Sequence, residues 1–457
     1  MASSPQAERS FRPERTVLEL GDAFYDPVQA ARFPEHILRF RNDRAAAEVG
    51  LDSLSDAEWI AHFGRFEALP GSLETPLALR YHGHQFRVYN PDIGDGRGFL
   101  FAQMRDDRDR LMDLGTKGSG QTPYSRFGDG RLTLKGGVRE ILATEMLEAL
   151  GVETSRTFSL IETGEELHRG DEPSPTRSSV LVRLSHSHIR IGMFQRLAYF
   201  QDAEAMRRLV DYVLRHYFGE EPGEDAPARL FDLVVARTAR LAAQYMAADF
   251  VHGVLNSDNI NVTGESFDYG PWRFAPDWSP GFTAAYFDHA GLYAFGRQPE
   301  AIHWDAMQLA ISLRLICDEE PLVEIMPRFG DRYAEEVTRA ILWRLGLVPR
   351  DATSDRALVA AIEQALRSTD TPVAGFFHDF FAGNVPDGYP EPFDAVKAAM
   401  AGYTPRTARD AAYWQGPPCT MLIDEVEAIW ARIAEADDWS ALHAKVAAIR
   451  TMGDALR

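Results

Sequence analysis

One short polar segment, set between long apolar stretches, constrains this chain more than any other feature. It reads HGVLNSDN over residues 252–259, and the triplet DYG follows at residues 268–270. Short motif matches are often accidental, so both strings are compatible with plain loops whose carboxylates are solvated. They are equally compatible with a loop that carries chemistry. The order of the predicted elements around the two strings distinguishes between these interpretations.

The two strings resemble the catalytic segment of small-molecule kinases that have a protein-kinase-like fold. Such kinases often carry H-G-D-x-x-x-x-N, in which the Asp deprotonates the attacking hydroxyl and the Asn holds Mg²⁺; a later D-F-G Asp holds a second ion. Here Val254, which cannot accept a proton, stands in the position of the base. Asp258 precedes the retained Asn259, and Asp268 stands where the D-F-G Asp would be. The resemblance implies a site that keeps its metal ligands and displaces its base.

The order of the other elements supports this interpretation. Glycine-rich, strand-like residues precede an amphipathic helix predicted over 138–150, and alternation predicts another strand over 179–191. From residue 202 onward the apolar spacing is helical, and a long buried helix is expected to lead directly into HGVLNSDN. A strand-rich half followed by a helical half predicts an α+β protein with a cleft at the junction.

Lys117 and Glu140 occupy the positions of an ion pair in this order. Lys117 lies among small residues in TKGSG, which would let its ammonium and the backbone amides approach phosphate oxygens. Glu140 falls in the first turn of the predicted helix, where a kinase-like fold places the glutamate that orients such a lysine. The plain alternatives are a solvated hairpin lysine and an acid favoured near a helix N-terminus.

Arg183 and Arg190 both lie in the predicted strand over 179–191. Both could point into the cleft, where a guanidinium suits bidentate phosphate contacts better than an ammonium does. Surface ion pairs are an equally good explanation of their spacing.

The predicted fold class is α+β, with a protein-kinase-like two-lobed fold. Its strand-rich N-lobe is followed by a helical C-lobe and by extra C-terminal helices. The predicted units are an N-terminal extension packing on the lobes (1–75), the N-lobe (76–200), the C-lobe with the catalytic loop (201–310) and a C-terminal helical region (311–457). A length of 457 residues suits two or three such units.

Composition excludes several classes of protein. The net charge of −20 disfavours a nucleic-acid binder, so nucleotide binding would need a local cationic pocket. Two cysteines, Cys317 and Cys419, cannot form a disulfide framework, and the histidines of HGH (82–84) and HSH (186–188) lack the partners of a zinc site. No signal-peptide core and no membrane-length apolar run occurs, so a cytoplasmic location without membrane association is expected.

Longer strings make the chain similar to a known family. It resembles the selenoprotein O family in HGHQFRVYNPDIGDGRGFLFAQ, DLGTKGSGQTPYSRFGDGRLTLKGGVRE, VLVRLSHSHIRIGMF, VHGVLNSDNINVTGESFDYGP and SPGFTAAYFDHAGLYAFGRQP. The resemblance is dense over residues 75–310. It implies a protein-kinase-like fold that binds ATP in a flipped orientation and acts as a protein adenylyltransferase, moving AMP to the hydroxyl of a protein side chain.

The resemblance also implies a role for individual residues. Asp258 would accept the proton, Asn259 and Asp268 would bind Mg²⁺ or alternatively Mn²⁺, and Lys117, oriented by Glu140, would bind phosphate. The rest of the nucleotide pocket would comprise Gly94, Gly96, Arg97, Asp129, Gly130, Arg183 and Arg190, with Asp268 also near the ATP phosphates.

Some positions depart from the family pattern. Arg87 stands where a glycine is usual, and Asp305 stands where an asparagine is typical. Beyond about residue 385 the resemblance fades, and the chain looks short for the family. No cysteine lies near the C-terminus to stand for the redox-active residue of some members, so redox regulation is not expected.

Three functions are weighed. The first is Mg²⁺-dependent transfer of AMP from ATP to Ser, Thr or Tyr hydroxyls of proteins, the protein itself included, with release of pyrophosphate. The second is an ordinary kinase-like phosphotransferase, which the valine in the base position disfavours. The third is a non-catalytic pseudokinase scaffold that binds ATP, disfavoured because both metal ligands are retained. ATP and hydroxyl-bearing proteins are the expected partners, without nucleic acid or membrane.

Overall fold

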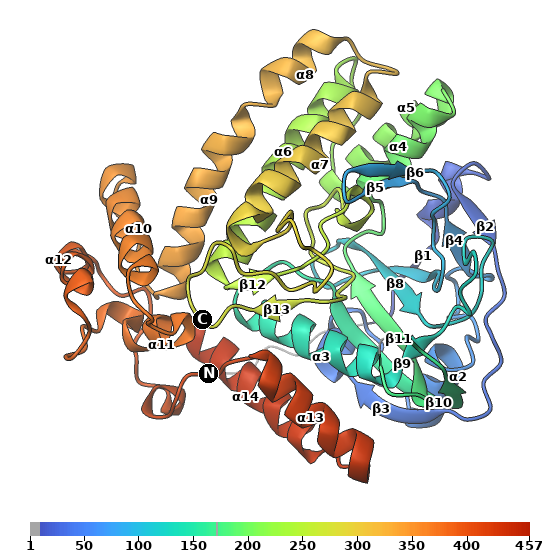
Figure 1. Cartoon of the computed structure of the whole chain (residues 1–457). Coiled ribbons are helices and arrows are strands. Elements are labelled where there is room, and N and C mark those ends of the chain that lie inside the picture. The colour runs from blue at the N-terminus through green and yellow to red at the C-terminus, as the bar shows by residue number, and fades with distance from the viewer. Residues whose placement is uncertain (1–9, 171) are drawn as a thin grey trace, which may run out of the picture.

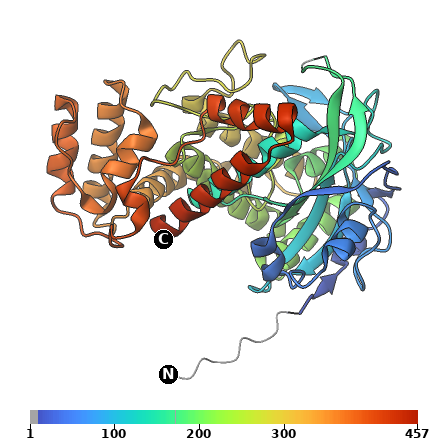
Figure 2. The same cartoon turned by 90° about the horizontal axis from the view of Figure 1, so that it is seen from below.

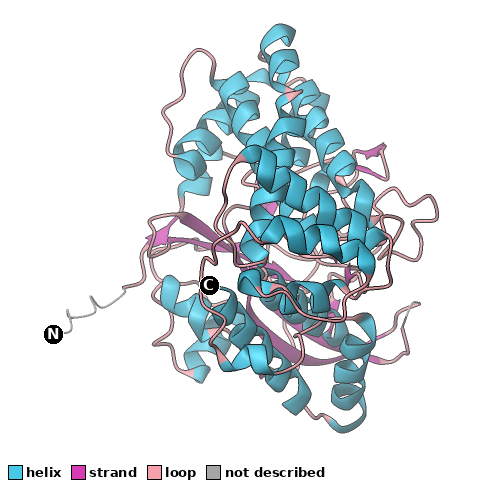
Figure 3. Ribbon diagram, turned by 90° about the vertical axis from the view of Figure 1, so that its left-hand side faces the viewer, coloured by secondary structure: helices cyan, strands magenta, loops and turns pink. Residues whose placement is uncertain are grey.

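A computed structural model describes residues 10–170 and 172–457. Residues 1–9, the polar start of the predicted N-terminal extension, and residue 171 lie outside the described residues. The described chain combines one large antiparallel sheet with layers of helices, and the sheet and the longest helices lie on different sides of the molecule (Figure 1). Figure 3 shows helices on both sides of the strands.

The large sheet is antiparallel throughout its pairings. Its main path runs in the order β2 (Tyr25–Pro27), β4 (Leu77–Leu79), β7 (Leu100–Arg105), β8 (Leu111–Lys117), β11 (Thr176–Ser185), β10 (Arg156–Leu167) and β3 (Ile37–Arg41). Two short strands join at its sides, β1 (Pro13–Glu14) on β7 and β9 (Leu132–Thr133) on β11. Strands β1 to β3 come from the section predicted as an N-terminal extension, so this section takes part in the sheet.

The two faces of the sheet are covered by different helices. On one face α1 (Asp43–Glu48) and α2 (Asp56–Phe63) pack on side chains such as Val180 and Val182 of β11. Leu181 points to the other face, which α3 (Leu134–Ala149) covers. The alternation predicted for this strand is therefore confirmed, but its predicted end at residue 191 was wrong: the strand ends at Ser185, and Arg190 precedes the helix that begins at Ile191.

Helix α3 begins four residues earlier than its predicted start at residue 138. The side chain of Thr133 caps it by accepting a hydrogen bond from the backbone N–H of Gly136, and the following glycines are accommodated inside the helix. Glu140 consequently lies in the second turn, and the prediction that it occupies the first turn was wrong. Its placement owes nothing to the helix N-terminus.

The helical half is built around α6 (Ala226–Ala247). It contacts α7 (Gln298–Leu313), α8 (Glu319–Ile325) and α9 (Arg328–Arg344), while α4 (Ile191–Tyr199) and α5 (Ala203–Val213) connect this group to the sheet. As predicted, the long buried helix α6 leads straight into the polar segment. The short pair β12 (Phe250–Val251) and β13 (Arg273–Phe274) brackets that segment, so both its ends are held.

The helices beyond residue 350 form two groups. Helices α10 (Ala352–Arg367), α11 (Val373–Asp379) and α12 (Asp394–Met400) pack with α9 at the side away from the sheet. Helices α13 (Ile423–Ala436) and α14 (Ser440–Leu456) return to lie along α3, as Figures 1 and 2 show from two directions. Gly453 lets α14 approach Ala149 closely, and Arg450 of α14 pairs with Glu145 of α3.

Two further sequence inferences bear on the fold. Cys317 and Cys419 are both free thiols. Within residues 10–170 and 172–457 none of the helices has the length and apolar character needed to cross a bilayer. The four predicted units and the cytoplasmic location stay predictions.

Candidate active site

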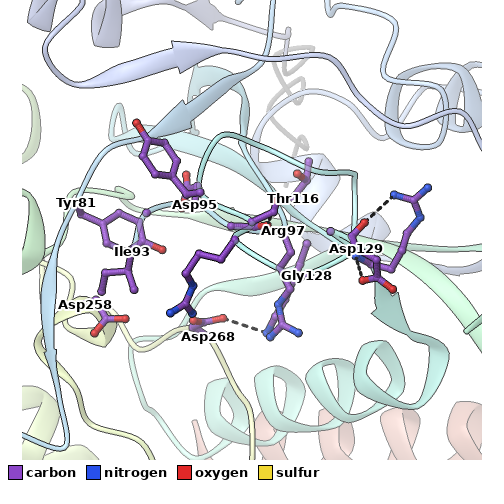
Figure 4. Close-up of a pocket in the computed structure, with 18 of the residues that line it drawn as sticks. Tyr81, Ile93, Asp95, Arg97, Thr116, Gly128, Asp129, Asp258 and Asp268 are labelled. Carbon is purple, nitrogen blue, oxygen red and sulfur yellow. Dashed lines mark hydrogen bonds and ion pairs between the residues drawn. The ribbon is translucent and has the colours of Figure 1, made fainter. Parts of the chain in front are cut away.

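A cavity of about 600 Å³ opens between the sheet and the polar segment. Its walls come from the glycine-rich residues 93–98, the end of β8, the loop 124–131, β11 and the segment that carries Asp258 and Asp268. Figure 4 shows Asp258, Asp268 and Arg97 facing one another across this space, with Asp129 at its far end. Ten of the predicted site residues line it: Gly94, Gly96, Arg97, Lys117, Asp129, Gly130, Arg183, Arg190, Asp258 and Asp268.

Lys117 is the cation that joins the sheet to the polar segment. At the end of β8, its buried ammonium contacts the carboxylate of Glu140 on α3 and lies 3.0 Å from Oδ1 of Asp268. The structure thus brings together the lysine and glutamate that the sequence placed on a strand and on a helix. It also adds a second carboxylate partner, which holds Lys117 at the floor of the cavity.

Asp268 sits in an uncommon backbone conformation. Its φ of +62° is left-handed, a region that residues other than glycine seldom occupy and that is often found at functional sites. Burial opposes its ionisation, but Lys117, Arg183 and nearby Arg190 together hold the pKa of the carboxyl well below its usual range. Asp268 is therefore a permanent anion facing a cluster of cations.

Arg183 and Arg190 are buried, and each has at least one side-chain nitrogen atom that lacks a hydrogen-bond partner within the described part of the chain. Nη1 of Arg183 lies 3.5 Å from Oδ1 of Asp268, yet neither Nη1 nor Nε makes a hydrogen bond within the described part of the chain. The guanidinium of Arg190 stacks 4.3 Å over the ring of Tyr81 and donates to Asp95 at 3.2 Å, while its Nε also has no partner there. Buried donors without partners are costly, which indicates that an anionic ligand completes them.

Asp258 lies at the opposite side of the cavity from Asp129 (Figure 4). It belongs to a short 3₁₀ turn, Ser257–Asn259, and only 7% of its surface is exposed. Burial raises the pKa of Asp258 to about 7, with Asp268 adding to the rise and Arg190 opposing it. A carboxylate with such a pKa can take a proton from a hydroxyl at neutral pH more readily than an ordinary aspartate.

Asn259 does not line the cavity. Its Nδ2 donates to the carbonyl of Val254 at 3.2 Å, so the amide oxygen is the atom it can offer to a ligand. Glu140 also lies outside the lining and acts through Lys117. Within the described residues, one group of three potential metal ligands of the His, Cys, Asp or Glu type lies close enough together to share an ion. It comprises Glu48, Asp106 and Asp107, away from this cavity.

Glycines allow the loop over the cavity to pack tightly. A side chain at Gly94 would collide with the ring of Tyr124, and one at Gly98 would collide with the carbonyl of Thr116. Asp129, predicted as a pocket residue, is engaged by Arg169 through two hydrogen bonds of 2.8 and 3.0 Å. Asp129 therefore holds the loop at the rim of the cavity. Because Arg169 occupies its carboxylate, Asp129 is not free to bind a cation at the centre of the cavity.

The sequence argument missed Asp95 and Tyr81, which orient Arg190 from two sides. Asp95 belongs to the sequence GDGR (94–97), in which only the two glycines and the arginine were predicted as site residues. Tyr81 carried no local signal, because its contact with Arg190 forms only after the chain folds.

The structure shows the surroundings of Arg87 and Asp305, the two positions that depart from the family pattern. Arg87 has a left-handed φ of +63°, which explains why a glycine suits this position, and it is held by Glu300 and the ring of Trp304. Asp305 is fully buried on α7, and neither carboxylate oxygen has a partner within the described ranges. Burial, with Asp258 adding to it, raises the pKa of Asp305 well above its usual value.

Comparison with known proteins places this geometry in a family. The family model described as "Protein adenylyltransferase SelO" matches residues 8–392. The chain belongs to the SelO family. This confirms the predicted resemblance and, with it, the prediction of an enzyme of the protein nucleotidyltransferase class.

Curated SelO relatives are similar along nearly their whole length. A protein nucleotidyltransferase YdiU of Synechococcus elongatus is 43% identical, with 96% of this chain and 95% of the relative covered. One from Gloeobacter violaceus is 44% identical over 98% and 96% of the two chains, and one from Vibrio cholerae is 35% identical over 80% and 74%.

Proposed function

We propose that this protein transfers AMP from ATP to Ser, Thr or Tyr hydroxyls of proteins and releases pyrophosphate. The observation that carries the proposal is the distribution of charge around one cavity. Lys117, Arg183 and Arg190 provide buried cationic donors around it, and Asp258, with a pKa of about 7 and next to Arg190, provides a base.

Each group has a part in the proposed step. The acceptor oxygen attacks the α-phosphorus, the bond from that phosphorus to the bridging oxygen breaks, and pyrophosphate leaves. The acceptor proton passes to Asp258. Lys117 and the two arginines stabilise the negative charge that develops on the phosphates, in a buried setting where such contacts are strong. Val254 can perform none of these tasks.

A divalent cation would be held at the edge of this cavity, because Asp268 lines it and Asn259, which does not, lies on the same polar segment. The carboxylate of Asp268 and the amide oxygen of Asn259 are hard oxygen donors of the kind that Mg²⁺ prefers, and Mn²⁺ would also suit them. The anionic state of Asp268 fits this role. When bound, the ion would neutralise phosphate charge; its residues would be these two, in the segment that β12 and β13 hold in place.

We further propose that the architecture is protein-kinase-like. In support, a strand lysine contacts a helix glutamate, a long helix leads into the loop with Asp258 and Asn259, and Asp268 follows that loop. The displaced base distinguishes this site from a phosphotransferase, because a reacting α-phosphate would lie elsewhere than a reacting γ-phosphate.

The test uses purified protein with Mg²⁺ and ATP labelled at either the α- or the γ-phosphate, with Asp268→Ala in parallel. The acceptors are the protein itself and a pool of synthetic peptides with a central Ser, Thr or Tyr. Label retained from α-labelled ATP alone is expected. Label from γ-labelled ATP alone would show a kinase, and tight MgATP binding without label would favour a scaffold.

A further inference from the structure

The hairpin of β5 (Gly83–Gln85) and β6 (Val88–Asn90) lies directly against the turn that carries Asp258. The strand edge of β5 that is not paired with β6 is occupied by side chains of the polar segment. The backbone N–H of His84 donates to Oγ of Ser257 at 2.8 Å, and that of Phe86 donates to Oδ1 of Asn256 at 3.0 Å. Two residues that precede the base are thus fixed to one strand edge.

The contact with Ser257 is part of a closed ring of hydrogen bonds. Oγ of Ser257 donates to Oε1 of Gln195 at 2.6 Å, and Nε2 of Gln195 donates to Nδ1 of His84 at 2.7 Å. Ser257 and Gln195 are buried, and Nδ1 of His84 is the acceptor because the amide nitrogen of Gln195 can only donate. Every member of this ring is satisfied, so its geometry is well determined.

Gly83 touches the base itself. A methyl group at this position would lie 2.7 Å from Oδ1 of Asp258, inside van der Waals contact. That oxygen is buried and has no hydrogen-bond partner among the residues that the structure describes. The carboxylate therefore occupies space that is open only because residue 83 has no side chain, and it is carried by the turn Ser257–Asn259.

We propose that Gly83, His84 and Gln195 are positioning residues that set the place of the Asp258 carboxylate for proton transfer. The inference rests on the proposed function, since it takes Asp258 as the base. Within residues 10–170 and 172–457, none of the three forms a hydrogen bond or ion pair with Lys117, Arg183 or Arg190, which assigns them to the base and not to phosphate binding. His84, one of the HGH histidines that lack the partners of a zinc site, thereby has a part in the reaction.

The test compares Gln195→Leu, which opens the ring, with Gln195→Glu, which keeps the acceptor for Ser257. Transfer from α-labelled ATP to the peptide pool gives kcat, and titration calorimetry gives the Kd of MgATP. Because a displacement of about 1 Å can cost roughly 100-fold in rate, Gln195→Leu should lower kcat about 10- to 100-fold. The Kd should stay unchanged, and Gln195→Glu should recover most of the rate.

Gly83→Ala tests the same idea without removing a hydrogen bond. It should lower kcat to a similar extent at unchanged Kd, whereas Gly330→Ala, on α9 with open space around it, should have no effect. Thermal unfolding of each variant shows whether the fold is kept. Wild-type transfer with unchanged kcat in both Gly83→Ala and Gln195→Leu would overturn the positioning role alone. Absence of wild-type transfer would overturn the proposed function and the inference that rests on it.

Discussion

The ammonium of Lys117 lies 3.0 Å from Oδ1 of Asp268 while it also contacts Glu140. One lysine therefore ties a strand of the sheet, a covering helix and the polar segment to a single point. A ligand that binds the ammonium of Lys117 has to compete with Asp268. The Asp268 carboxylate, once released from Lys117, would then be free to hold a cation. In the proposed reaction, phosphate binding and metal binding would be coupled through this contact.

Replacement of Lys117 by Ala should reduce AMP transfer by about 10²- to 10³-fold, the usual loss when a preorganised cationic or hydrogen-bonding group is removed. The measurement is incorporation of α-label at saturating ATP. Lys135→Ala is the matched control, because Lys135 pairs with Glu427 away from the cavity. Retained activity in Lys117→Ala would place the phosphate site elsewhere.

Substitutions of Asp258 and of Asp268 should impair different steps, proton transfer and metal-dependent ATP binding respectively. Asp268→Asn removes a permanent anion, so it should weaken the Mg²⁺-dependent part of ATP binding, measured by calorimetry with and without the ion. Asp258→Asn should leave that binding intact and slow transfer by about 10²- to 10⁴-fold, the range for loss of a general base. Normal transfer by Asp258→Asn would show that another group takes the proton.

Stability should respond to pH through Asp258. The pKa of its carboxyl is raised to about 7 in the folded state, so the folded protein binds its proton more tightly than the unfolded chain does, and folding loses stability as pH rises toward 7. Each pKa unit corresponds to about 1.4 kcal/mol. Asp258→Asn should therefore melt at a higher temperature than the wild type at pH 8, with a smaller difference at pH 5. An equal difference at both pH values would contradict the raised pKa.

Arg183→Lys should weaken ATP binding more than Arg169→Lys does. The guanidinium of Arg183 is buried with two unpartnered nitrogens, and an ammonium cannot reproduce their fork. Arg169 lies at the rim, where its pair with the half-exposed Asp129 contributes little. Dissociation constants for ATP measured side by side, at one salt concentration, distinguish the two positions; equal effects would mean that Arg183 does not contact the nucleotide.

Helix α14 should support the site from a distance. Arg450 pairs with the buried Glu145 on α3, the helix that also carries Glu140. Arg450→Ala leaves that carboxylate buried without its partner, at a cost of about 1–3 kcal/mol. A lower melting temperature together with reduced transfer is expected, and Arg432→Ala, whose pair with Asp438 is exposed, is the control. Full activity in Arg450→Ala would show that α3 needs no such support.

Local patterns carried much of the fold and of the candidate site. The helix spacing before HGVLNSDN, the alternation of the strand with Arg183 and the order of lysine and glutamate are properties of neighbouring residues, and the structure shows each of them. The start of α3 was missed because two glycines precede its apolar stripe. Glycine usually signals a turn, yet the Thr133 cap and packing on β10 and β11 keep these residues helical.

Contacts between distant segments could not be predicted. Asp95 and Arg190 are 95 residues apart, and His84 and Ser257 are 173 residues apart. Nothing in the neighbourhood of His84 distinguishes it from a structural histidine, because its meaning comes from Gln195 and Ser257. The short strands β1 to β3 were missed for a similar reason, since they are too brief to show alternation and owe their pairing to the longer strands.

The return of α14 to α3 sets an order of events in the cell. Glu145 waits for a partner 305 residues further along the chain, so a ribosome completes the sheet, α3 and both aspartates long before the helix that braces them. In a nascent chain, α3 would therefore form before the Arg450 contact that braces it exists. If α3 needs this contact as expected, full transfer activity would be acquired only after α14 has been made.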